Sequence, residues 1–94
     1  MKKIELRFDK KFTHIAGNDY GYEIYCDQIR DFFDGKEKLE IWFPDYIEGV
    51  SISFVQGLIK DMLKIVTKDK LLGLIELHSS SDFLDKRLYD NLRF

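Results

Sequence analysis

The sequence has one cysteine, one proline and two histidines, and it contains no long apolar run. A single cysteine cannot form an intramolecular disulfide, so we expect a fold that does not depend on oxidation. No segment approaches the roughly 20 consecutive apolar residues that span a bilayer. Residues 1–7 alternate in charge and do not resemble a signal peptide. These absences predict a cytoplasmic protein without a membrane partner.

Positive charge is not in excess either. The chain has 15 Lys and Arg against 17 Asp and Glu, a formal net charge of -2. Lysines alternate with acidic residues in segments 36–38 and 68–70. Proteins that bind nucleic acids usually carry a basic surface, because neutralising phosphates and releasing counterions supplies much of their affinity. The sequence therefore predicts no nucleic-acid partner.

Residues that could catalyse a reaction or hold a metal are few and are not grouped along the chain. His14 and His78 lie far apart and in no metal-ligand spacing, whereas a structural zinc site takes about four ligands. Cys26 falls among apolar helix positions, which favours a small core residue over a nucleophile. Three aspartates share one helix face and are typical of a solvated surface (Asp27, Asp31 and Asp34). No glycine-rich phosphate loop follows a predicted strand. We expect no enzyme, no metal site and no cofactor.

What the sequence does contain is a regular alternation of strand and helix patterns. Its 94 residues, 45% hydrophobic and 15% aromatic, suit one domain over residues 1–94. Segments 4–8 and 39–43 alternate apolar and polar side chains, which predicts two strands with one buried face each. Segment 71–77 is apolar at nearly every position, which predicts a central strand that is buried on both faces.

Three amphipathic helices are predicted between and after these strands. The first covers residues 22–33, capped by Asn18 or Asp19. The second starts at Ser53, because Ser53 and Gln56 form a capping-box pattern. The third follows the serines of 79–81. The order β-α-β-α-β-α predicts a small α/β domain with a mostly parallel sheet and helices mainly on one face. A flavodoxin-like arrangement with helices on both faces is the alternative.

The second strand–helix junction carries the most distinctive pattern. Ser51 and Ser53 lie at or beside a helix start, where an added phosphate would meet free N–H groups and the positive end of the helix dipole. With Ser53 expected to serve as the cap, Ser51 would be the freer hydroxyl. The sequence therefore predicts possible phosphorylation at Ser51 or Ser53.

The segment Gly49 to Ile59, read with the strand and turn before it, resembles the STAS-like domains of unknown function, relatives of anti-sigma-factor antagonists. The resemblance covers roughly residues 1–92 and is sharpest over about a dozen of them. It implies binding to an ATPase-type regulator and release of that partner when Ser51 or Ser53 is phosphorylated. The antagonists typically have an Asp-Ser pair before the helix, whereas Val50 and Ile52 precede the two serines here.

These features together predict a non-enzymatic regulatory module that binds a protein partner, such as an ATPase- or kinase-like regulator. The expected partner surface consists of Asp45, Tyr46, Glu48, Gly49, Ser51, Gln56 and Lys60. A small phage- or mobile-element-encoded inhibitor that blocks a host protein by surface occlusion is the alternative. Trp42 is expected to point outward from a half-wet sheet, which also predicts a homodimer through that face.

Overall fold

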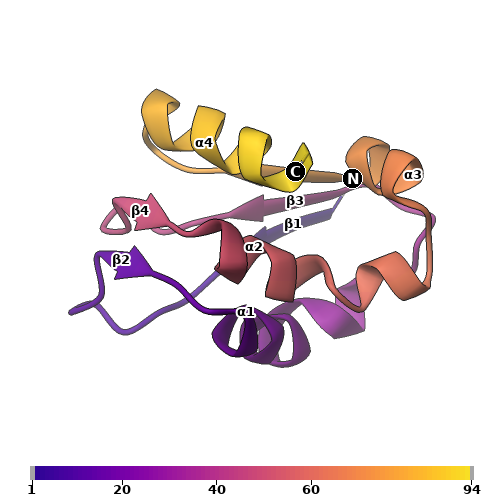
Figure 1. Ribbon diagram of the computed structural model, residues 1–94, viewed down its shortest axis with the longest axis horizontal. Coiled ribbons are helices and arrows are strands. Elements are labelled where there is room, and N and C mark those ends of the chain that lie inside the picture. Colours follow the sequence, from indigo (N-terminus) through magenta and orange to yellow (C-terminus); the bar gives the residue numbers. More distant parts are fainter. Residues whose placement is uncertain (1, 94) are drawn as a thin grey trace.

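Three parallel strands form the main sheet, in the order β1-β3-β5. The computed structural model describes residues 2–93 of the chain. Strand β1 spans Lys2–Glu5, β3 spans Leu39–Trp42 and β5 spans Ile75–His78. Both neighbouring pairs are parallel, and Ile41 of β3 lies beside Ile4 on one side and Leu77 on the other. The small, mostly parallel α/β fold is confirmed (Figure 1).

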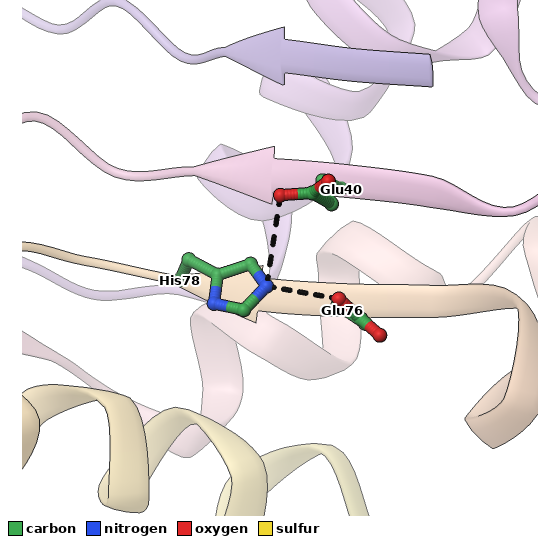
Figure 2. A group of neighbouring side chains, drawn as sticks. All are labelled: Glu40, Glu76 and His78. Atoms are coloured by element: carbon green, nitrogen blue, oxygen red, sulfur yellow. Dashed lines mark hydrogen bonds and ion pairs between the residues drawn. The ribbon is translucent and has the colours of Figure 1, made fainter. Parts of the chain in front are cut away.

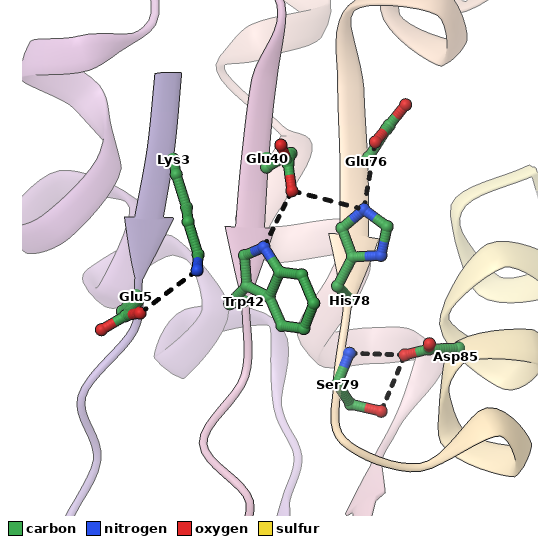
Figure 3. A network of polar contacts seen from close by, with 8 residues as sticks. All are labelled: Lys3, Glu5, Glu40, Trp42, Glu76, His78, Ser79 and Asp85. Atoms are coloured by element: carbon green, nitrogen blue, oxygen red, sulfur yellow. Dashed lines mark hydrogen bonds and ion pairs between the residues drawn. The ribbon is translucent and has the colours of Figure 1, made fainter. Parts of the chain in front are cut away.

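The central strand β3 shows how the sheet divides the chain between a core and an open face. Leu39 and Ile41 are almost completely buried, while Glu40 and Trp42 between them are half-exposed. The buried residues of the strands pack together with those of the helices in one core. Figure 3 views the open face, with α4 (Asp82–Arg93) drawn beside β5. The prediction of a strand with one buried and one wet face is confirmed for β3. The first predicted strand, 4–8, shares only residues 4–5 with β1, where Ile4 is half-buried against the core and the other residues of the strand are exposed.

The first predicted helix begins earlier than expected and changes its winding along its length. Helix α1 spans Asn18–Ile24, a π-helical turn (η1) follows over Tyr25–Ile29 and a 3-10 turn (η2) over Arg30–Phe32. Gly17 occupies the position before α1 and no side chain caps it. The expected cap from Asn18 or Asp19 was therefore wrong, because both residues already lie inside the helix.

Helix α2 spans Ile52–Ile59, and its cap differs from the predicted one. Ser51 Oγ accepts a hydrogen bond from the Phe54 N–H at 3.1 Å, and the Ser51 backbone is extended. Ser53 lies in the first turn of the helix and accepts the Gly17 N–H instead, at 3.1 Å. The capping box from Ser53 was wrong. The two serines offer two possible helix starts, and the contact with Gly17 is a tertiary one that the local pattern does not contain.

The segment predicted as a central strand is divided between a helix and an edge strand. After α2, a 3-10 turn (η3) spans Met62–Lys64, and helix α3 spans Lys68–Leu74 with Thr67 as its cap. Leu71 and Leu74 are buried, and residues three apart share one helix face. The buried residues of 71–74 thus face the core from a helix. Strand β5 begins only at Ile75 and forms an edge of the sheet.

Two further elements complete the fold near the junction. Strands β2 (His14–Ile15) and β4 (Gly49–Val50) form a separate two-stranded parallel sheet. Helix α4 spans Asp82–Arg93 and buries its three leucines as predicted. Its start is held by Ser79, whose hydroxyl donates to Asp85 Oδ1 at 2.8 Å (Figure 3). No helix within residues 2–93 is long and apolar enough to cross a membrane.

Helices α1 and α2 cross at two glycines, which lets their backbones touch. A β-carbon at Gly57 would overlap the carbonyl oxygen of Asn18, and one at Gly21 would overlap that of Phe54. Both glycines are buried in the contact. This close crossing fixes the position of α2 against α1 and so the place of the α2 N-terminus at the junction.

Candidate functional site

The β4–α2 junction borders a groove that α4 completes on its far side. The groove has a volume of about 370 Å³. Gly49 of β4 and the cap residue Ser51 contribute one wall, and Phe83 and Arg87 of α4 contribute another. His14 of β2 lies at the same groove. Three elements that are remote in sequence thus meet at the start of α2 (Figure 1).

Phe83 is the most exposed large apolar side chain of the described residues, with 70% of its surface accessible. Its ring lies 5.7 Å from the guanidinium carbon of Arg87, one helical turn later. An arginine over an aromatic face is held there by attraction to the ring. The groove is therefore bordered by an exposed aromatic ring with an arginine fixed beside it.

The two serines of the junction are tied to each other and to the backbone. Ser51 Oγ and Ser53 Oγ lie 2.8 Å apart, within hydrogen-bond distance. Ser51 also caps α2 through Phe54, and Ser53 accepts the Gly17 N–H. The expectation that Ser51 would be the freer hydroxyl was wrong, because Ser51 is the residue that caps the helix.

The structure separates the predicted partner surface into groups. Glu48, Gly49 and Ser51 line the groove. Asp45 is exposed at a different hollow of about 540 Å³, next to Pro44 at the end of β3.

The other three predicted surface residues lie away from this groove. Tyr46 is half-buried, and its hydroxyl donates to the carbonyl oxygen of Phe8 at 2.5 Å, so its polar end is used within the fold. Gln56 and Lys60 are exposed farther along α2. The ammonium of Lys60 lies 5.2 Å from the centre of the Tyr22 ring.

Cys26 lies half-buried against the core, in the π-helical turn η1. Hydrogen bonds with Cys26 and Asp61 raise the pKa of Tyr22 to about 12. Both bonds, together with the negative charge of Asp61, favour the neutral phenol.

A second group of polar side chains gathers on the open face of the sheet. Glu40 of β3 and Glu76 of β5 are direct neighbours across the two strands. His78 Nε2 lies 3.0 Å from Glu76 Oε1 and 3.9 Å from Glu40 Oε1, pointing between the two carboxylates (Figure 2). The sequence patterns did not predict this cluster, because Glu40 is distant in the chain from Glu76 and His78. Parallel pairing of β3 with β5, combined with the alternation of each strand, is the signal that would have found it.

Trp42 is the aromatic neighbour of this cluster. Its ring stacks on that of His78 with a centroid separation of 4.7 Å, and its Nε1–H donates to Glu40 Oε1 at 3.0 Å. The Lys3 ammonium lies 4.9 Å from the indole centre. Trp42 does point outward as predicted, but polar partners surround it. A homodimer through this face stays a prediction. Its original reason, an exposed apolar patch around Trp42, does not hold, because the ring has polar neighbours.

Comparisons with protein-family models, with curated proteins and with solved structures found no match to this chain. The resemblance to STAS-like domains stays a prediction, carried by the junction segment 49–59 and by the order of the predicted elements.

Proposed function

We propose that this chain is a non-enzymatic, cytoplasmic binding module of STAS-like type that docks a protein partner on the junction groove. The partner class follows from the resemblance of segment 49–59 and is an ATPase- or kinase-like regulator. The single observation that carries the docking site is Phe83, an aromatic side chain left 70% exposed at the edge of the groove.

The chemistry of the groove suits a protein partner. Burying a phenylalanine side chain contributes roughly 1.5–3 kcal/mol, so the exposed Phe83 ring is a large source of binding energy for an apolar side chain of the partner. Arg87 adds a guanidinium beside the ring, and aromatic residues and arginine are frequent at interface hot spots. Glu48 and His14 provide polar groups at the same groove.

Ser51 is the better placed of the two serines for a phosphate switch. It caps α2 and lines the groove, so a phosphoryl group there would lie at the positive end of the helix, in the groove that Arg87 also lines. A phosphoryl group on Ser53 would instead displace the Gly17 N–H that ties the loop before α1 to α2. We therefore assign the proposed switch to Ser51.

The docking surface is tested with two matched aromatic–arginine pairs on the same helix. Phe83 and Arg87 border the groove, whereas Tyr89 and Arg93 form an equally spaced pair elsewhere on α4. Tyr89 is also well exposed, at 56%. A partner captured with the wild-type chain would be identified and purified, and its affinity measured for Phe83→Ala and for Tyr89→Ala.

We expect Phe83→Ala to weaken binding by about 2 kcal/mol, roughly thirty-fold, and Tyr89→Ala to leave it unchanged. Equal affinities of the two variants would contradict docking at the groove. A nucleotide-binding regulator as partner would support the STAS-like assignment. A host enzyme without a nucleotide site, inhibited by the chain, would support the occlusion alternative instead.

The phosphate switch has its own test. The purified partner and ATP are expected to add one phosphoryl group to the wild-type chain, seen in the intact mass, and none to Ser51→Ala. Ser53→Ala is the control and is expected to be modified as the wild type is. Modification of Ser51→Ala at Ser53 would contradict the assignment to Ser51, and an unmodified wild-type mass would contradict the switch itself.

A further inference from the structure

The strand register places two carboxylates directly opposite each other on the open face. Glu40 and Glu76 are paired residues of β3 and β5, and like charges in such positions destabilise a sheet unless a positive group lies between them. His78, two residues after Glu76 on the same face, turns its Nε2 toward both carboxylates (Figure 2). Two oxygen ligands and one imidazole nitrogen therefore converge from two strands.

We propose that Glu40, Glu76 and His78 form a binding site for a zinc ion. The Glu40, Glu76 and His78 ligand atoms all lie within 4.8 Å of one another. Zinc bonds of about 2.0–2.2 Å place tetrahedral ligand atoms about 3.4 Å apart, and the separations of 3.0 and 3.9 Å from His78 Nε2 bracket that value. Small rotations of the carboxylates complete the geometry, and solvent supplies the fourth ligand.

The ligand set selects a transition metal over magnesium or calcium. The hard ions Mg²⁺ and Ca²⁺ prefer oxygen ligands alone, whereas imidazole suits zinc and its neighbours in the first transition row. The side chains remain reachable from solvent, with 26% of Glu40, 31% of His78 and 46% of Glu76 exposed. Zinc binds the Nε2 lone pair and takes the place of the proton there: an imidazolium releases that proton to solvent, and a neutral imidazole carries its proton on Nδ1 instead.

Trp42 orients two of the three ligands. Its indole N–H donates to the same Glu40 oxygen that faces His78, and its ring stacks on the imidazole (Figure 3). Groups that hold metal ligands in this way typically contribute 10–100-fold to metal affinity. Trp42 is the positioning residue of the site, and as the only tryptophan of the chain it also reports on it.

The experiment titrates ZnCl₂ into the metal-free protein and measures the heat of binding. A Cys26→Ser background removes the only thiol as a competing ligand. We expect one zinc ion per chain, with affinity at least ten-fold lower in His78→Ala and in Glu76→Gln. His14→Ala removes the other histidine and is the matched control, expected to bind as the parent does. Trp42→Phe keeps a ring but loses the indole N–H, and we expect about ten-fold weaker binding.

A second measurement needs no substitution of the ligands. In the unmodified protein, zinc is expected to shift the imidazole resonances of His78 and leave those of His14 in place. Absence of saturable binding would overturn the proposal. Retention of full affinity in His78→Ala, or a shift of His14 alone, would overturn it equally. The outcome is independent of the partner proposal, because the metal cluster and the groove share no residue.

Discussion

The two faces of the β1-β3-β5 sheet differ in almost every respect, although their residues alternate along the same strands. The inner face presents Leu39, Ile41 and Leu77, which the helices cover. The outer face presents polar groups such as Glu40 and His78, around a single indole ring. The inner residues contribute burial, roughly 25 cal/mol for each Å² of apolar surface removed from water. The outer residues contribute less burial and instead make polar contacts with one another at the surface.

Ile41→Ala should give the largest loss of stability and tests the inner face directly. Ile41 is completely buried at the centre of the sheet, and truncating such a residue costs about 2–5 kcal/mol through lost burial and a cavity. Glu40→Ala, one residue earlier on the outer face, is the control and should cost less than about 1 kcal/mol. Denaturant unfolding measures both, and comparable losses would contradict the division between the faces.

Gly57→Ala extends the comparison to the helix layer that covers the inner face. The added methyl group would overlap the Asn18 carbonyl oxygen, so α1 and α2 must separate, at a cost of about 1–3 kcal/mol or more. Gly73→Ala in α3 meets no atom within 4 Å and is expected to stabilise by roughly 0.5–1 kcal/mol. Thermal unfolding of both variants checks this, and a neutral Gly57→Ala would mean that the crossing adjusts freely.

Ser51→Ala tests the cap of α2 at the β4–α2 junction, where this helix meets the surface. The variant loses the cap on the Phe54 N–H, and we expect about 1 kcal/mol of destabilisation. Ser53→Ala loses the bond from Gly17, with an expected cost of about 0.5–1.5 kcal/mol. Exposed Ser80 provides the control, since Ser80→Ala should leave the free energy of unfolding unchanged. If Ser51→Ala behaved like Ser80→Ala, Ser51 would not be the working cap.

Glu76→Gln in metal-free protein should have the smallest effect. It removes one of two like charges that face each other across β3 and β5, but also weakens the contact with His78. These two changes have opposite effects on stability at an exposed position. We therefore expect the free energy of unfolding, measured with denaturant, to change by no more than about 0.5 kcal/mol. A loss above about 2 kcal/mol would show that the outer face also stabilises the sheet, which would contradict the proposed difference between the two faces.

Local patterns predicted the elements whose periodicity matched their burial. Alternation along 39–43 identified β3, and the three leucines of α4 identified that helix. Alternation along 4–8 indicated a strand near the N-terminus, but β1 ends at Glu5. The prediction of a central strand over segment 71–77 was wrong, because an apolar run of this length is compatible with a buried strand and with a buried helix turn. The start of α2 was off by two residues, since only the contact between Ser53 and Gly17 distinguishes the two serines.

The sequence by itself determined the parallel α/β architecture and which residues of β3 face the core, because apolar periodicity specifies burial wherever one face is covered. Only the tertiary structure brought together the residues of the two proposed sites. Phe83 reaches the junction groove because α4 packs across the end of β4. Glu40, Glu76 and His78 meet because parallel pairing sets the register of β3 against β5. Both depend on contacts between distant segments, which no local pattern encodes.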